Sequence, residues 1–250
     1  MRYGLVVSNI GTHSDVRAVV ELAKAAEEAG WEGLFAWDHL GFVWGVPSAD
    51  PWVLLTACAM ETSRILLGTA VTPVPRRRVQ NLAHTVATLD RLSGGRVVFG
   101  AGLGGNRSEF ERFGEDYSRR RRIALLDEGL DALRKLWDGE TVNGVTLQPP
   151  PVGRVPIWVG GKRRDALERA ARYDGWLADS SEPDRMSLSP GEIAEKARGI
   201  RGDVVVTGYS SLANPRDYEV AGATWWLESL HDRRGSPEEM LAVVRAGPPA

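Results

Sequence analysis

The sequence predicts an α/β fold in which residues 1–250 form a single-domain (β/α)8 TIM barrel. Short apolar runs rich in β-branched residues recur along the chain, and nearly every one precedes a segment with helical apolar periodicity. Alternating strands and helices imply a parallel sheet, and eight such runs within 250 residues match a closed barrel. An open, doubly wound sheet is the alternative.

The expected strands are short, apolar and followed by polar or glycine-containing segments. They cover residues 3–10, 33–37, 65–71, 96–99, 156–160, 175–179, 203–207 and 224–230. In a barrel the carboxyl ends of the strands meet at one rim, where active sites lie. The segments expected at this rim are Ser8-Asn9, Asp38-His39, residues 69–72, 102–107, 160–163, 179–181 and 208–210, and Glu228.

Helices are expected from apolar spacing and from capping residues. Their ranges are residues 15–29, 50–63, 79–92, 119–137, 164–173, 192–199 and 237–245, and residues 214–220 are at most weakly helical. Asp50-Pro51 is a typical helix start. Ser93-Gly94-Gly95 is a typical helix end, because glycine readily adopts a positive φ. Residues 106–118 are expected to be a polar loop, and residues 139–154 a small excursion with a hairpin.

The composition indicates an ordinary globular protein, with 43% hydrophobic and 26% charged residues. A net charge of −2 does not favour nucleic acid or anionic membranes as partners. The single Cys58 excludes an intramolecular disulfide framework and a multi-cysteine zinc site, so no metal is expected. The amino terminus reads as a strand and not as a signal peptide, and no membrane span is found. A cytoplasmic protein is expected.

Two rim segments carry residues suited to chemistry. His39 can donate a hydrogen bond or move a proton near neutral pH. The alternative is a structural role, in which the histidine holds its loop in place by hydrogen bonds. The Gly160 to Arg163 segment precedes a helix and combines backbone N–H groups with positive charge, as phosphate sites do. A solvated helix start is the alternative for that segment.

Other charged or aromatic residues are expected to be structural. Asp90 and Arg96 lie on the amino side of a strand, the face of a barrel that serves stability. Alternation places Trp226 and Glu228 on one side of their strand and Trp225 on the other. Glu228 is either a carboxylate at the mouth or a satisfied ion pair. The basic runs at residues 76–78 and 119–122 are expected to be solvated and paired with acids, and Cys58 to lie in the core.

Motifs along nearly the whole chain resemble those of the luciferase-like flavin-dependent oxidoreductases. They are Asp38-His39, RILLGTAVTPVPRR, ATLDRLSGGR, VVFGAGLGGNRSEF, LWDGE, PIWVGGK and DGW, in this order. The family includes bacterial luciferase, alkane monooxygenases and deazaflavin (F420)-dependent dehydrogenases and reductases. The resemblance implies a (β/α)8 barrel with the flavin ring over the strand ends, in agreement with the strand count.

The resemblance also implies roles for individual residues. His39 would be the catalytic residue, with Trp44 packed beside the cofactor, and a cis peptide bond would join Ala70 to Val71 against the flavin ring. The expected cofactor-binding residues are Asp38, Thr69, Ala70, Val71, Gly102, Asn106, Arg107, Gly160, Gly161, Lys162 and Arg163. Leu103 stands where F420-dependent sugar-phosphate dehydrogenases carry a glutamate acid, which argues against sugar dehydrogenase chemistry.

The implied function is a flavin-dependent oxidoreductase that acts on a small organic substrate. With FMN, it would carry out monooxygenation through a flavin peroxide, using reduced flavin from a partner reductase. With F420, it would transfer hydride, and residues 76–78 could meet the polyglutamate tail of that coenzyme. A homodimer is expected from the family. Two alternatives are a non-catalytic flavin-binding barrel subunit and a phosphate-binding barrel enzyme that uses no flavin.

Overall fold

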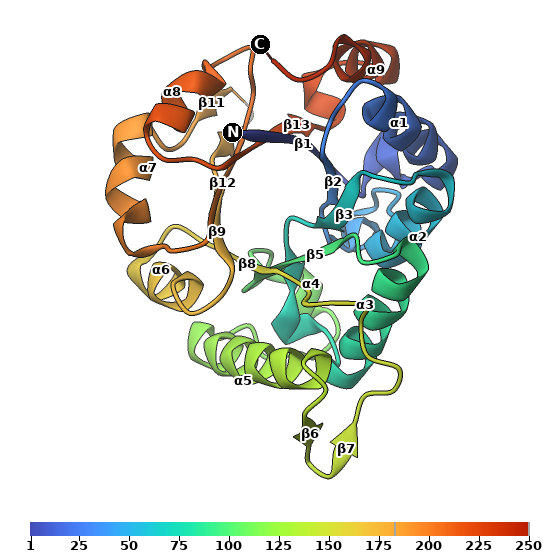
Figure 1. Ribbon diagram of the computed structural model, residues 1–250, viewed down its shortest axis with the longest axis vertical. Helices are drawn as coiled ribbons and strands as arrows, with labels where there is room; N and C mark the ends of the chain where they lie inside the picture. Colours follow the sequence, from blue (N-terminus) through green and yellow to red (C-terminus); the bar gives the residue numbers. More distant parts are fainter. Residues whose placement is uncertain (183, 250) are drawn as a thin grey trace.

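The centre of the protein is a closed barrel of parallel strands (Figure 1). The structure is a computed structural model, and it describes residues 1–182 and 184–249. The barrel strands are β1 (Arg2–Val7), β2 (Gly33–Ala36), β3 (Leu66–Thr69), β5 (Val97–Gly102), β8 (Ile157–Gly160), β9 (Gly175–Asp179), β12 (Asp203–Gly208) and β13 (Trp225–Leu230). Pairing of β1 with β13 and of β3 with β5 closes the circle. The predicted (β/α)8 barrel is therefore confirmed, and the open-sheet alternative is excluded.

Helices surround the strands (Figure 1). They are α1 (Val16–Glu28), α2 (Pro51–Glu61), α3 (Val79–Ser93), α4 (Ser108–Glu111), α5 (Arg119–Trp137), α6 (Arg164–Ala170), α7 (Pro190–Lys196), α8 (Pro215–Val220) and α9 (Pro237–Ala246). Their ends follow local chemistry: the Asp50 carboxylate accepts hydrogen bonds from the first turn of α2, and Gly94 ends α3 at φ 73°. Ser236 forms a capping box with Glu239 at the start of α9.

Two segments differ from the prediction. The stretch expected to be a polar loop contains α4, which forms because buried Phe110 anchors it and Asn106 Oδ1 accepts the Ser108 N–H at 3.1 Å. The segment expected to be weakly helical is α8, which starts with the Asn214 cap and Pro215. Both helices are short, so their formation depends more on anchoring side chains and caps than on helical periodicity.

The excursion at residues 139–154 contains the predicted hairpin, formed by β6 (Thr141–Val142) and β7 (Val145–Thr146). Asn143 and Gly144 both have positive φ, as tight hairpin turns require. Shorter strands near the rim are β4 (Thr72–Pro73), β10 (Ser181–Glu182) and β11 (Arg185–Met186).

Large side chains fill the barrel interior. Phe35 lies against Trp158 with ring centroids 5.0 Å apart, and Trp158 lies 5.4 Å from Trp225. Trp226 belongs to the layer between strands and helices, so the predicted alternation of Trp225 and Trp226 is confirmed. Because the lumen is packed, a ligand must bind at an end of the barrel.

The amino side of the strands is structural, as predicted. The Arg96 guanidinium is buried and donates to the carbonyl oxygens of Ala59, Thr62 and Ile65 at 2.9 Å. Asp90 accepts the Val97 N–H at 3.3 Å. Cys58 lies in the core, where burial raises the pKa of its thiol to about 12.

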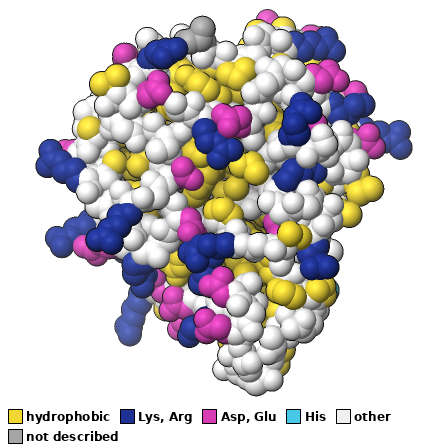
Figure 2. Space-filling view, in the orientation of Figure 1, with side chains coloured by type: hydrophobic (Ala, Val, Ile, Leu, Met, Phe, Trp, Pro, Cys, Tyr) yellow, Lys and Arg dark blue, Asp and Glu magenta, His cyan; other side chains and the backbone are white. Residues whose placement is uncertain are grey.

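The charged residues of the surface are mixed in sign. Figure 2 shows Lys and Arg side chains interspersed with Asp and Glu over one face of the molecule. That face therefore lacks the single-signed field that attracts nucleic acid. Among the helices of the described residues, none combines the length and the apolar character that a bilayer crossing requires.

Candidate functional site

Two of the cavities that open among the segments following the barrel strands bear on the predicted site. One has a volume of about 490 Å³, and we call it the Gly160 cavity. Its lining includes Ala70, Val71, Gly102, Gly160, Gly161, Lys162 and Arg163. The other has a volume of about 360 Å³, and we call it the Tyr209 cavity. Its lining includes Ser8, Ile10, Trp37, Ser181, Tyr209 and His231.

The Gly160 cavity brings together seven of the residues predicted to contact a cofactor. The Ala70–Val71 peptide bond is cis, which confirms that prediction. A Cβ on Gly102 would lie 2.3 Å from Val71 Cγ2, and a Cβ on Gly160 would lie 3.0 Å from Val71 Cγ1. The glycines are thus required because the Val71 side chain occupies the space above them.

Positive charge predominates in the Gly160 cavity. Five cationic side chains line it against the two carboxylates of Asp165 and Asp179. The cationic residues are Arg119, Arg122, Lys162, Arg163 and Arg169. Arg119 pairs with Asp165 at 2.6 Å, and Arg169 is held by Asp127 at 2.8 Å, whereas Lys162 donates to the neutral Ser187 hydroxyl at 3.0 Å. Arg122 donates to the carbonyl oxygens of Tyr117 and Gly104, so Lys162 and its neighbour Arg163 are the cations best placed to meet an anionic ligand.

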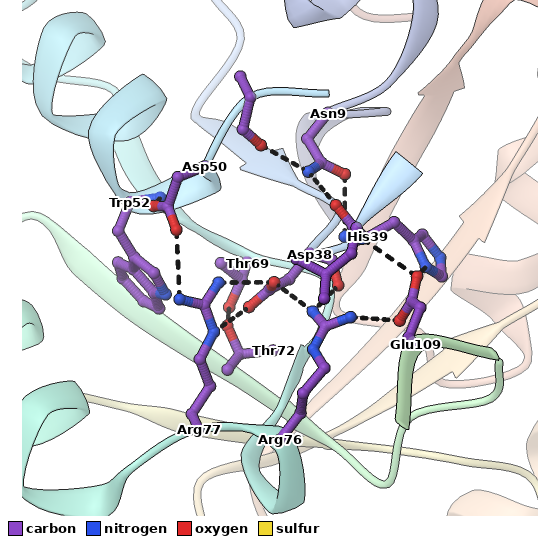
Figure 3. Close-up of polar contacts among 12 residues, drawn as sticks. Asn9, Asp38, His39, Asp50, Trp52, Thr69, Thr72, Arg76, Arg77 and Glu109 are labelled. Atoms are coloured by element: carbon purple, nitrogen blue, oxygen red, sulfur yellow. Dashed lines mark hydrogen bonds and ion pairs between the residues drawn. The ribbon is translucent and has the colours of Figure 1, made fainter. Parts of the chain in front are cut away.

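His39 is held by hydrogen bonds from two distant segments, at Asn9 and at Glu109 (Figure 3). Asn9, after β1, accepts the His39 N–H at 3.0 Å and donates to the His39 carbonyl at 2.8 Å. The ring Nδ1 lies 2.7 Å from Glu109 Oε1 of α4. The Trp37 and Trp44 rings lie beside the imidazole, with centroids 5.8 and 5.5 Å away. Both the backbone and the ring of His39 are thereby oriented.

Glu109 determines which nitrogen of His39 carries hydrogen. Its side chain is 1% exposed, and its carboxylate also contacts the Arg76 guanidinium and accepts the Leu40 N–H at 3.1 Å. Burial alone would raise the pKa of Glu109, but the hydrogen bond and charge of His39 and the charge of Arg76 lower it. An ionised Glu109 accepts from Nδ1–H, which leaves Nε2 of a neutral His39 as an acceptor. Nε2 has no hydrogen-bond partner within residues 1–182 and 184–249.

Asp38 and Thr69 lie beneath the rim. The Asp38 carboxylate is enclosed by Arg76 at 2.6 Å and Arg77 at 2.7 Å (Figure 3). Thr69 is fully buried and donates to the Gly100 carbonyl at 3.0 Å. Both residues support the neighbouring rim segments, and a direct contact with a cofactor stays a prediction that their burial does not favour.

Asn106 and Arg107 line neither of these two cavities, but they line a separate, open one of about 460 Å³ together with Ser108, Glu111 and Arg112. Asn106 Oδ1 accepts hydrogen bonds at the start of α4, and Arg107 pairs with Glu111 at 3.1 Å. Their role in cofactor binding also stays a prediction.

The predicted basic run at residues 76–78 is not simply a solvated face. Arg76 is 4% exposed and bridges Asp38 to Glu109. Arg77 contacts Asp38 and also pairs with Asp50 at 3.2 Å.

Glu228 is a satisfied ion pair, one of its two predicted alternatives. It is buried, accepts the Trp226 Nε1–H at 3.0 Å and lies 3.4 Å from Arg234.

Sequence reasoning missed Glu109, Trp37 and His231 as site residues. Trp37 and His231 do carry a signal, because Trp37 directly follows β2 and His231 directly follows β13.

Comparison with known proteins identifies the family and the fold of the chain. The family model for luciferase-like monooxygenases matches residues 2–239. The chain is 33% identical over 178 residues to the F420-dependent glucose-6-phosphate dehydrogenase of Nakamurella multipartita, in an alignment that covers 65% of this chain and 52% of that relative. It is 28% identical over 238 residues to the 5,10-methylenetetrahydromethanopterin reductase of Methanolobus tindarius, covering 90% and 70%. The alignment thus spans about half the length of the first relative.

Solved structures share the fold. An F420-dependent secondary alcohol dehydrogenase in complex with an F420–acetone adduct superposes with a TM-score of 0.76 at 16% identity, covering 98% of this chain and 97% of that chain. The oxygenating constituent of 3,6-diketocamphane monooxygenase from Pseudomonas putida, in complex with FMN, has a TM-score of 0.65 at 16% identity, covering 84% and 67%. The family match over nearly the whole sequence identifies the chain as a member of the luciferase-like monooxygenase family.

Proposed function

We propose that this protein is an oxidoreductase that binds coenzyme F420 or FMN in the Gly160 cavity and handles the substrate proton through His39. The observation that carries the proposal is the convergence of two arrangements on one rim. A cavity with surplus positive charge lies there, and so does a histidine whose tautomer is set by a buried carboxylate. Family membership supplies the redox chemistry that such a rim would serve.

The residues present fit such a coenzyme. Its phosphoryl group would meet Lys162 and Arg163, and the apolar Val71 side chain would lie against the planar ring. Since α6 has only seven residues, side-chain charge and not the helix is expected to dominate anion binding.

The bound coenzyme would supply hydride or oxygen-transfer chemistry, and the chain would supply orientation and proton handling. Glu109 accepts Nδ1–H of His39, so Nε2 is the atom that takes up or returns the substrate proton. Arg76 and the Leu40 N–H hold the Glu109 carboxylate in place. The flanking Trp37 and Trp44 rings would hold the imidazole in place from two sides.

F420 is the first candidate, because both the glucose-6-phosphate dehydrogenase of Nakamurella multipartita and that of Amycolatopsis mediterranei carry F420 in their names. FMN is the second, favoured by the FMN-bound structural neighbour. Glucose 6-phosphate is not proposed as the substrate of this chain, because Leu103 lines the cavity where sugar-phosphate dehydrogenases of the family carry an acid.

Fluorescence titration with F420, FMN and reduced FMN tests the proposal. Submicromolar binding of one coenzyme is expected, and a His39→Ala variant should keep that binding while losing turnover over a panel of small alcohols, ketones and aldehydes. His84→Ala, which removes an exposed histidine of α3, is the matched control. Absence of binding by all three coenzymes would overturn the proposal. Binding without any turnover by the wild type would instead support a non-catalytic subunit.

A further inference from the structure

The Tyr209 cavity adjoins the proposed reaction centre through a shared side chain. The Trp37 ring lies 5.8 Å from the His39 ring and, at the same centroid distance, stacks on His231 with an interplanar angle of 30°. Trp37 also lines the cavity. A molecule bound there would therefore lie next to the tryptophan that contacts His39.

The composition of the cavity wall suits a small neutral molecule. Ile10, Val46 and Trp37 form apolar wall, and the charged residues Asp232 and Arg233 have opposite signs. This balance contrasts with the cationic surplus of the Gly160 cavity. A neutral ligand with a predominantly apolar body and one polar group fits such a lining.

The hydrogen bonds of His231 set the direction of the Tyr209 proton. The Arg233 N–H donates to His231 Nδ1 at 3.2 Å, so Nδ1 is an acceptor and the hydrogen of the neutral ring is on Nε2. Burial and the charges of Arg234 and Arg233 lower the pKa of His231, which favours this neutral form. His231 Nε2 lies 2.7 Å from Tyr209 Oη and donates to it. The phenol hydrogen must then be donated to another acceptor. This side chain adjoins both the cavity and the Ser181 hydroxyl, whose hydrogen bond lowers the pKa of Tyr209 against the larger, raising effect of burial.

Tyr209 is also fixed as a rigid, protonated donor. Its side chain is 1% exposed, and the Arg234 guanidinium lies 4.2 Å from the centre of its ring. Burial raises the pKa of the Tyr209 hydroxyl, so it keeps its hydrogen at neutral pH. A donor that is already oriented loses little freedom when it binds an acceptor.

We propose that Tyr209, positioned by His231, donates a hydrogen bond to the oxygen atom of a small, mainly apolar alcohol or carbonyl substrate held in the Tyr209 cavity. This inference rests on the proposed function and deepens it, because it names a substrate class and the group that binds the substrate oxygen. No bond to Tyr209 forms or breaks, because the phenol only donates a hydrogen bond.

Binding of fluorinated probes, followed by 19F NMR, tests the inference without coenzyme. The probes are 4-fluoroacetophenone, 1-(4-fluorophenyl)ethanol and, as the oxygen-free analogue, 1-ethyl-4-fluorobenzene. Wild-type protein should bind the two oxygen-containing probes about three- to tenfold more tightly than the hydrocarbon. Tyr209→Phe should abolish this preference. Tyr218→Phe should retain the preference. That variant loses a comparable buried hydroxyl, which donates to the Leu188 carbonyl at 2.9 Å and does not line the cavity.

His231 is tested separately as a positioning residue. His231→Leu should lose the preference, and His231→Gln should restore part of it, because an amide N–H can again donate to Tyr209 Oη. Equal preference in wild type and Tyr209→Phe would overturn the inference, as would a wild type with no preference. If Tyr209→Phe does not fold, an unchanged preference in His231→Leu overturns it instead. Coenzyme titration of the same preparations reports on the proposed function independently, since the probe measurement needs no coenzyme.

Discussion

His39 Nδ1 lies 2.7 Å from Glu109 Oε1, which joins the segment after β2 to the short helix α4 across 70 positions of sequence. The same carboxylate contacts Arg76, which in turn holds Asp38. The proposed proton-handling residue therefore adjoins a buried row of alternating charges formed by Glu109, Arg76 and Asp38. Its orientation depends on side chains contributed by other segments of the chain.

Glu109→Gln is expected to lower turnover by about 10²- to 10⁴-fold while coenzyme affinity changes little. The amide nitrogen of glutamine can donate to Nδ1, which favours hydrogen on Nε2 and removes the acceptor there. Steady-state kinetics together with coenzyme titration would measure the two effects. Glu111→Gln, which alters an exposed acid of the same helix, should be silent. Normal turnover of Glu109→Gln would show that the pair does not set the tautomer.

Acid should destabilise the fold through Glu27. Its carboxylate accepts the N–H groups of Ser63, Arg64 and Ile65 in the turn before β3. Burial would raise the pKa of Glu27, but these hydrogen bonds lower it to about 2 from its usual 4.5. Because the folded-state pKa is depressed, the stabilisation is fully present above pH 4.5 and is lost as the pH falls through about 2.

Glu27→Gln should therefore reduce the free energy of unfolding at neutral pH by about 1–2 kcal/mol, and this deficit should shrink as the pH falls through that window. Urea denaturation across the acid range would measure it. Glu28→Gln, an exposed neighbour on α1, serves as the control. A deficit that is independent of pH would contradict the assignment.

The barrel and most of the rim are readable from the sequence because they depend on local patterns. Apolar runs, caps such as Asp50 and turns such as Ser93-Gly94-Gly95 each act within a few residues. The rim position of His39 follows directly from the end of β2. These features need no knowledge of which distant segments pack together.

The partners within the site are not readable in this way, because they are long-range pairings. Glu109 lies in a polar stretch without periodicity, and only the folded barrel brings it to His39. Arg76 and Arg77 resemble any exposed basic run, yet they lie against the buried Asp38 carboxylate. The hydrogen-bond direction at Tyr209 depends equally on the fold, since it is set by His231 from the next strand.

Coenzyme affinity should depend on Lys162 and be sensitive to salt. Lys162→Ala is expected to weaken binding by about three- to tenfold at low ionic strength and by less at high salt, because screening reduces the attraction between charges at the surface. Fluorescence titration at two salt concentrations would measure both. The control is Arg164→Ala, which removes a 93% exposed cation that pairs with Glu168. Equal losses in both variants would point to net charge and not to a site at Lys162.

The floor of the Gly160 cavity should tolerate no side chain at Gly102. A Cβ there would lie 2.3 Å from Val71 Cγ2, so Gly102→Ala must displace Val71. Overpacking of this kind costs about 1–3 kcal/mol, and the displaced valine would intrude on the coenzyme site. Thermal unfolding and coenzyme titration should both report a loss. Gly153→Ala should report neither, since Gly153 does not line the cavity and a Cβ at that position meets no atom within 4 Å.

A second substitution separates steric conflict from a need for glycine itself. If Val71 is the obstacle, adding Val71→Ala to Gly102→Ala should recover much of the lost stability, because the smaller side chain leaves room for the new Cβ. The coenzyme affinity of the double variant should stay below that of the wild type, since the proposed apolar contact with the ring is reduced. Failure of Val71→Ala to recover stability would show that Gly102 is required for another reason, such as the backbone conformation at the end of β5.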